Sequence, residues 1–372
     1  MNKKIVTLFE ILLILVSLFL TAYILFGLVF VNSEPKSEGA ETPVSLGVMD
    51  RFDMQMNNIL SDALNGVLSI KKVYWLYDDD QVAPEPDQDK FGVTEDPASL
   101  AWLLEDAAEL LEGQETYFST EVQIPQGSKI NYYLDDTIMV ITWKELIGGV
   151  TYTISEVKIA HPSQFRRFLA GGEYGSKIQL TTTEMAASVN AIVASSGDFY
   201  KFRDSGIIVY DGELRKISGQ SYDSCFIDEN SDLQFVYAGQ ITDPETAKQY
   251  IEDNDIRFSL GFGPVLIENG EIVKINRYYL IGEPRDRYAR AGLGQLGKLH
   301  YLLVTANSEF LPVVPTLFEF AEAGLQMGCD KFYNLDGGQT AVICMNDKLI
   351  NKVVYGYQRQ ISDIIYFATA IP

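Results

Sequence analysis

Apolar and polar residues follow two periodicities in this chain, and together they predict strands with a few flanking helices. Beyond about residue 115, short apolar runs separated by turn residues are typical of strands. Helical spacing interrupts them in three places, each opened by a capping residue: Thr181 before 182–190, Asp243 before 244–252 and Thr316 before 317–327. We therefore expect an α+β (mixed α/β) fold, with one large mixed-sheet domain and flanking helices.

An apolar run near the N-terminus predicts a membrane anchor. Residues 11–31 carry no charge and are long enough to cross about 30 Å of hydrocarbon as a helix. Lys3 and Lys4 precede the run and an acidic region follows it, so the short N-terminus is expected in the cytoplasm. The run exceeds the roughly 7–15 apolar residues of a cleaved signal peptide. We interpret it as an uncleaved signal anchor of a single-pass cell-membrane protein whose main domain lies outside the cytoplasm.

The predicted organisation has five segments. In chain order they are a cytoplasmic N-terminus (1–10), a transmembrane signal anchor (11–31), a stalk (32–46), a helical and loop-rich membrane-proximal region (47–114) and the large domain (115–372). The stalk is polar and rich in Glu, Ser and Pro, which is typical of a flexible linker.

Composition excludes several classes of partner and chemistry. The formal charge of −22 argues against a nucleic-acid binder and against docking on an anionic lipid surface, so membrane contact is expected through the one N-terminal helix. Three cysteines are too few for a disulfide scaffold. The chain has only two histidines and no GxSxG, CxxC, HExxH or phosphate-binding glycine motif, which leaves few bases for a serine or cysteine triad.

Three stretches predict a turn of small residues that carries one charged residue and lies at one end of an apolar strand. They are Ser196-Gly197-Asp198 after 191–194, Arg290 to Gly294 before 300–305, and Asp336-Gly337-Gly338 after 332–335. Taken singly, each favours a plain structural role over a site; Asp-Gly between 332–335 and 341–345 predicts a hairpin turn. Taken together, they supply a guanidinium for phosphate oxygens and two carboxylates for acid–base work at a glycosidic bond.

Five motifs in a fixed order resemble those of the phosphodiester glycosidases. In chain order they are VASSGDFY (193–200), the hairpin 206–212, Phe262-Gly263-Pro264, RAGLGQ (290–295) and NLDGGQT (334–340). The resemblance covers roughly residues 145–372. It implies a hydrolase that cleaves a sugar-1-phosphodiester at the glycosidic bond and releases the sugar.

The resemblance also implies roles for residues at matching positions. Asp336, Asp198 and Arg290 would be the catalytic residues, with Arg290 on the phosphate. Substrate binding would fall to their small and polar neighbours: Ser196, Gly197, Asn334, Gly337, Gly338 and Thr340. Which carboxylate is the acid stays open. No cofactor is assigned, although the two carboxylates are compatible with a divalent cation whose ligands the sequence leaves unknown.

Two positions depart from the family pattern and keep a second hypothesis open. Ser196 stands where the family usually has Asn, and Gln339 stands where a third glycine is usual. The first hypothesis is a membrane-anchored, extracellular enzyme that acts on a sugar-1-phosphodiester in a cell-surface glycan or polysaccharide. The alternative is a glycan-binding or scaffold protein of the same fold with impaired catalysis.

Overall fold

The computed structural model describes most of the large predicted domain and little before it. The described residues are 73–78, 81–100, 124, 127–198, 200–202, 206–218, 222–275, 283–307 and 313–372, which all lie in one compact unit within 64–372. The predicted signal anchor at 11–31, the N-terminal segment before it and the stalk lie outside the described residues. Among the helices that are described, none combines the length and apolarity needed to cross a membrane.

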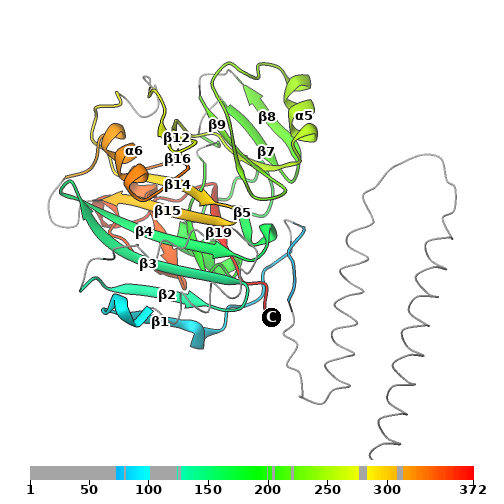
Figure 1. The fold of residues 1–372 in the computed structure, drawn as a ribbon. Helices are drawn as coiled ribbons and strands as arrows, with labels where there is room; N and C mark the ends of the chain where they lie inside the picture. Colours follow the sequence, from blue (N-terminus) through cyan, green and yellow to red (C-terminus); the bar gives the residue numbers. More distant parts are fainter. Residues whose placement is uncertain are drawn as a thin grey trace, which may run out of the picture. The chain divides into compact units, whose positions relative to one another are not determined.

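Two antiparallel sheets dominate the described chain (Figure 1). The first has nine strands in the order β1 (Phe91–Thr94), β2 (Ile130–Leu134), β3 (Ile138–Ile147), β4 (Val150–Ile159), β15 (His300–Asn307), β14 (Arg290–Gly297), β16 (Lys331–Leu335), β12 (Val265–Glu268) and β13 (Glu271–Ile272). The second has five, in the order β18 (Lys348–Leu349), β17 (Ile343–Met345), β6 (Val193–Ser196), β19 (Asp363–Phe367) and β5 (Phe165–Leu169).

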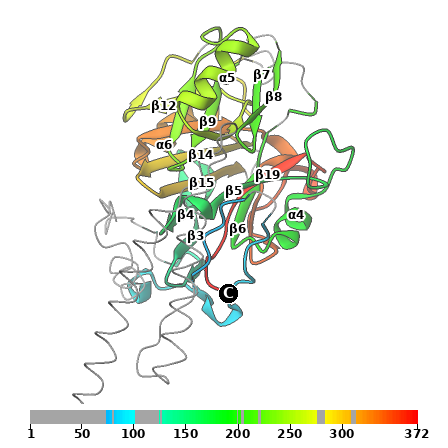
Figure 2. The same ribbon diagram turned by 90° about the vertical axis from the view of Figure 1, so that its right-hand side faces the viewer.

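Smaller elements complete the described fold. A three-stranded sheet has the order β10 (Leu233–Val236), β9 (Ser224–Asp228), β11 (Ile256–Leu260), and a hairpin pairs β7 (Gly206–Tyr210) with β8 (Glu213–Ser218). The α-helices of the described residues are α4 (Thr182–Ser188), α5 (Pro244–Asp253) and α6 (Leu317–Gln326), and Figure 2 shows α4 beside β6 and β19. All three predicted caps are confirmed, with the side chains of Thr181, Asp243 and Thr316 accepting backbone N–H groups. Mostly sheet with three helices, the described chain has the predicted mixed α+β character.

The main core lies between the two large sheets. Alternate residues of the nine-stranded sheet point into it, and so do residues of β6, β17 and β19. Its fully buried members include Val140, Val157, Leu293, Leu303 and Leu335 from the first sheet and Val193, Ile343, Ile365 and Phe367 from the second. Each such side chain contributes about 1.5–3 kcal/mol through burial, so this contact fixes how the strand ends of the two sheets meet.

The opposite face of the nine-stranded sheet is covered by α6, and Phe332 fills the space between them. A Cβ on Gly292 of β14 would lie 2.6 Å from the Phe332 ring, and one on Gly324 of α6 would lie 2.3 Å from it. Phe320 packs on the same ring, with centroids 5.0 Å apart. The two glycines therefore provide the room that this phenylalanine occupies.

Two sequence-based predictions about local structure are wrong. The stretch from Arg290 to Gly294 is not a turn but the start of strand β14, because its glycines serve close packing under Phe332 rather than chain reversal. Asp336-Gly337-Gly338 does not close a hairpin either. Strand β16 belongs to the nine-stranded sheet and β17 to the five-stranded sheet, so the chain crosses between sheets at Asp336.

We predict that Phe332→Ala destabilises the protein by about 3–5 kcal/mol, because it leaves a cavity bounded by two glycines that cannot fill it. The control is Phe318→Ala. Phe318 lies on α6 itself and is 39% exposed, so this substitution should cost less than about 1 kcal/mol. Denaturant unfolding of both variants measures the difference. Equal losses would contradict the packing role given to Phe332.

Candidate active site

The site forms where the ends of β6 and β16 meet. β6 leads into Gly197 and Asp198, while β16 leads into Asp336. The Ser196 hydroxyl donates to the Asp336 carbonyl oxygen at 3.2 Å and links the two ends. Asp198 and Asp336 are 3% and 8% exposed, and the charge of Asp198 is among the influences on the pKa of Asp336. The structure thus brings two of the three predicted catalytic residues together.

Asp336 is a buried carboxyl group with one strong partner. Burial raises its pKa to about 6, and the negative charge of Asp198 adds to this rise. Arg359 opposes the rise by pairing its Nη2 with Asp336 Oδ2, and Thr340 and the Gly337 backbone also favour the ionised form. The result is a carboxyl group that exchanges its proton close to neutral pH, which suits a general acid.

The glycines after Asp336 allow a close backbone contact with β14. A Cβ on Gly337 would lie 2.3 Å from the Ala289 carbonyl oxygen, so only glycine fits there. Gly338 donates its N–H to the same oxygen at 2.9 Å, with a φ of +65°. Thr340 donates its hydroxyl to the Gly337 carbonyl at 2.8 Å. The predicted glycines therefore shape the loop that carries Asp336.

Asp198 is fixed through both its backbone and its carboxylate. Its N–H lies 3.1 Å from each carboxylate oxygen of Asp363, the first residue of β19. Its Oδ2 accepts the Gly261 N–H at 2.7 Å, just beyond the end of β11. A Cβ on Gly197 would lie 2.3 Å from Asp363 Oδ2, so the glycine before Asp198 is needed for this approach.

A buried ion pair lies beneath Asp198. Arg167 Nε of β5 donates to Asp363 Oδ2 at 2.7 Å, and both side chains are fully buried. Burial raises the pKa of Asp363 above its usual range, with Arg167 opposing the rise and Asp198 adding to it. Burial also disfavours the charge of Arg167, but Asp363 and Asp198 outweigh that and keep its pKa above the usual value.

The backbone of Arg290 lies beside the site, but its side chain points toward Asp286 and Tyr288 and not toward Asp198 or Asp336. Its Cα lies 3.5 Å from a Cβ built on Gly337. Its Nη2 donates to the Asp286 carbonyl at 3.1 Å, and its guanidinium lies 5.2 Å from the Tyr288 ring centroid. Burial lowers its pKa to about 10, and neither Asp198 nor Asp336 is among the groups that influence it. Within the described residues its buried Nε has no hydrogen-bond partner.

Two further positions of the last motif, the buried Asn334 and the partly exposed Gln339, make contacts with backbone groups. The Asn334 side-chain amide donates to the Gly263 carbonyl oxygen at 2.8 Å. This hydrogen bond joins the predicted Phe-Gly-Pro motif to β16. Gln339 occupies the position of the expected third glycine, and its carbonyl accepts the Arg359 N–H at 3.4 Å. The side-chain nitrogen of Gln339 is buried without a hydrogen-bond partner among the described residues.

The geometry gives no separate metal centre. Among the described residues, no group of three or more His, Cys, Asp or Glu side chains is arranged to hold a metal ion. Asp363 is already engaged by Arg167 and by the Asp198 amide, so it does not extend the Asp198–Asp336 pair into a ligand set.

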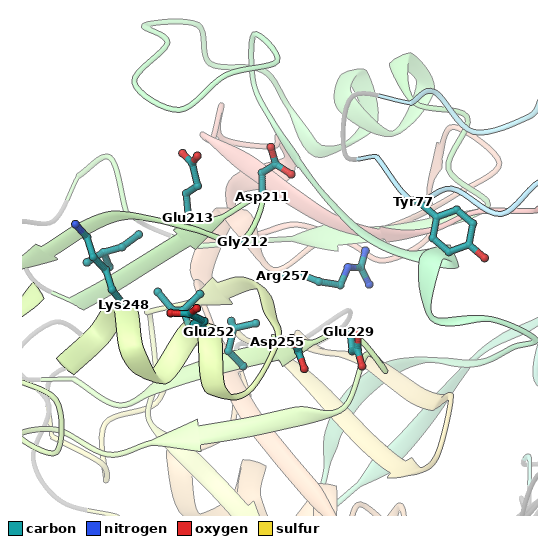
Figure 3. Close-up of a pocket in the computed structure, with 12 residues that line it drawn as sticks. Tyr77, Asp211, Gly212, Glu213, Glu229, Lys248, Glu252, Asp255 and Arg257 are labelled. Atoms are coloured by element: carbon teal, nitrogen blue, oxygen red, sulfur yellow. The ribbon is translucent and has the colours of Figure 1, made fainter. Parts of the chain in front are cut away.

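A cavity of about 820 Å³ lies apart from these carboxylates, along α5 and the β7–β8 hairpin (Figure 3). Carboxylates outnumber cations in its lining: Asp211, Glu213, Glu229, Glu252 and Asp255 against Lys248 and Arg257. None of the predicted site residues lines it. It is therefore distinct from the site at the strand ends.

The family comparison coincides with this site. Residues 189–368 match the phosphodiester glycosidase family model, and the resemblance predicted from the ordered motifs is confirmed over that range. The match begins later than the predicted start near residue 145. It supports a glycosidase-type function, that of a hydrolase acting on phosphodiester-linked glycosidic bonds.

Solved structures and curated sequences add less. The catalytic domain of zebrafish N-acetylglucosamine-1-phosphodiester alpha-N-acetylglucosaminidase, auto-inhibited by its pro-peptide, has a TM-score of 0.49 at 17% identity and covers 62% of this chain and 82% of that chain. A hypothetical protein from Synechocystis has a TM-score of 0.44 at 14% identity, covering 64% of this chain and 63% of that chain. A comparison with curated proteins found no match.

Sequence reasoning missed three charged residues of the site. Arg167, Asp363 and Arg359 contact or flank the predicted pair, yet none lies in the motifs at 193–200, 290–295 or 334–340. One signal was available for Asp363, which opens the apolar run 364–367 and is therefore a polar residue at a strand end.

We predict that Asp336→Asn does not destabilise the protein above pH 6. The carboxyl group ionises near 3.8 when unfolded but near pKa 6 when folded, so the stability linked to its proton is present below about pH 4 and lost as pH rises through 6. Asn stays neutral throughout. The variant should match the wild type near pH 4 and exceed it by about 1–3 kcal/mol at pH 8 in denaturant unfolding. Exposed Asp330→Asn is the control, and a pH-independent difference for Asp336→Asn would contradict the burial of an ionisable carboxyl group.

Proposed function

We propose that this protein hydrolyses a sugar-1-phosphodiester linkage in a cell-surface glycan or polysaccharide. One observation carries the proposal: two buried aspartates from different sheets, Asp198 and Asp336, meet at strand ends within the region that matches the phosphodiester glycosidases. The pKa of Asp336, raised by burial to about 6, adds the proton-donating capacity that glycosidic cleavage needs.

In the proposed reaction, the bond between the anomeric carbon and the phosphate oxygen breaks. Asp336 gives its proton to the departing phosphate oxygen. Water adds to the anomeric carbon and passes a proton to Asp198, whose carboxylate is oriented by the Gly261 N–H. The products are the free sugar and a phosphate monoester.

Arginine side chains near Asp336 would bind the phosphate. Arg359 is 39% exposed and already pairs with Asp336, so it can contact both the acid and a bound phosphate diester. Arg290, assigned to the phosphate on sequence grounds, has its Cα beside the Gly337 backbone, and its buried Nε has no hydrogen-bond partner among the described residues. We retain it as a second phosphate-binding residue, which requires its side chain to turn from Asp286.

We predict that Asp336→Asn and Asp198→Asn each lower kcat by about 10²–10⁴-fold, because each removes one proton-transfer group. Wild-type kcat should fall as pH rises through about 6, where Asp336 loses its proton. The measurement is release of free sugar from a panel of sugar-1-phosphodiesters that includes N-acetylglucosamine-1-phosphodiesters, with the full chain. Asp330→Asn, at the other end of β16, should retain wild-type turnover.

The alternative function, a glycan-binding or scaffold protein, is favoured by Gln339 at the expected third glycine. It requires binding of the glycan without turnover, and binding that survives Asp336→Ala. Turnover that disappears in Asp336→Asn and Asp198→Asn would exclude the alternative. Absence of sugar release across the panel, with binding retained in Asp336→Ala, would exclude the enzyme.

We further propose that residues 11–31 anchor the protein in the cell membrane with residues 32–372 outside the cytoplasm. The charge-free length of the run and the lysines before it support this. The chain should sediment with membranes, and externally added protease should degrade residues beyond 32 in intact cells. A variant in which residues 1–31 are replaced by a cleavable export signal should be released in soluble form. Protection of the main domain from protease would reverse the proposed orientation.

A further inference from the structure

Two consecutive arginines of β5 are both buried, but their side chains bind different parts of the chain. Arg166 and Arg167 are each 1% exposed. Arg166 donates to the carbonyls of Leu76 and Asp78 at 2.8 and 2.7 Å, which ties the early segment 73–78 to the domain. Arg167 instead reaches the Asp363 carboxylate at 2.7 Å. The same strand thus presents one arginine that serves chain packing and one that lies beneath the candidate site.

Asp363 connects Arg167 to the backbone of Asp198 through hydrogen bonds to both. Its Oδ2 accepts from Arg167 Nε, and both of its oxygens lie 3.1 Å from the Asp198 N–H. The Asp363 carbonyl also accepts the Gly197 N–H at 3.1 Å. Consecutive N–H groups at Gly197 and Asp198 are therefore both held by one residue.

The other arm of Arg167 reaches the chain that holds the Asp198 carboxylate. Arg167 Nη1 donates to the Ser259 carbonyl. Ser259 is itself fixed, because its hydroxyl donates to the Ile207 carbonyl and accepts the Val209 N–H, both at 2.8 Å. Two residues further on, the Gly261 N–H donates to Asp198 Oδ2. One guanidinium therefore bridges the two segments that fix the backbone and the carboxylate of Asp198.

Stability alone is a weak reason for this arrangement. A fully buried ion pair repays its desolvation only with complete hydrogen bonding, and apolar replacements are often no less stable. Arg167 falls short of complete hydrogen bonding, because its Nη2 is buried with no partner among the described residues. The pair is better explained by the geometry that it imposes on its neighbours.

We propose that Arg167 and Asp363 form a positioning pair that holds Asp198 in its working orientation. The proposal rests on the proposed function and assigns part of the site to β5, which precedes the region matched by the family model. Arg167 and Asp363 act through Asp198 and are not themselves the groups that exchange protons with the substrate.

The test compares Arg167→Lys with Arg166→Lys in the full chain, since the two arginines share a strand and a degree of burial. Lysine keeps the charge but cannot bridge Asp363 and Ser259 together. Arg167→Lys should lower kcat by about 10²-fold with KM within about threefold, as expected when a catalytic group is misplaced by about 1 Å. Arg166→Lys should keep kcat within about threefold of the wild-type value, even if its Tm falls by as much as that of Arg167→Lys. Equal losses of kcat in the two variants would overturn the proposal.

A second variant, Asp363→Asn, tests the positioning role by a measurement that needs no substrate. Its result can therefore differ from the result for the proposed function. Asp363→Asn keeps the side-chain volume but weakens the link to Arg167, and it should also lower kcat with little change in KM. Amide hydrogen exchange of residues 193–198 should rise in Asp363→Asn and not in Arg166→Lys. Unchanged exchange would overturn the positioning role whatever the substrate. Raised exchange in Asp363→Asn, combined with a wild-type protein that shows no turnover, would support the positioning role and reject the proposed function.

Discussion

Apolar packing between the nine-stranded and five-stranded sheets is the constraint on which the candidate site depends. Asp336 follows β16 of one sheet and Asp198 follows β6 of the other, so their separation is set by the core between them. Leu335, the last residue of β16, and Val193, the first residue of β6, are both members of that core. A change in sheet packing would therefore move the carboxylates relative to one another.

Burial changes the pKa values of Asp336 and Asp363, and it also makes their ionised forms costly unless a cation pairs with them. Removing Asp336 and Asp363 from water raises the pKa of both carboxyl groups, to about 6 for Asp336, and arginines oppose the rise in both cases. The arginines differ in exposure: Arg167 is fully buried, whereas Arg359 is 39% exposed. The first pair is suited to fixed geometry, whereas the exposed guanidinium of the second is accessible to an anion from solvent.

Sequence reasoning recovered what is local and missed what depends on tertiary contact. The helix caps at Thr181, Asp243 and Thr316 were predictable because a cap needs only residues a few positions away. Ordered motifs also located Asp198 and Asp336. The crossing at Asp336 was mistaken for a hairpin, because Asp-Gly between apolar runs does not reveal which sheet each run joins. Arg167 and Asp363 are 196 positions apart, and no local pattern signals that they pair.

The charge of the site differs from that of the chain. The formal net charge is −22, which would repel an anionic substrate at long range, yet ionic screening limits that repulsion to about 8–10 Å at physiological salt. At the site, Arg167 pairs with Asp363 and Arg359 pairs with Asp336, so arginines offset two of the three carboxylates. A proton taken up by Asp336 near pH 6 then adds local positive charge. In the proposed function, recognition of a phosphodiester depends on short, directed arginine contacts and on the protonation state of Asp336, not on the overall field of the protein.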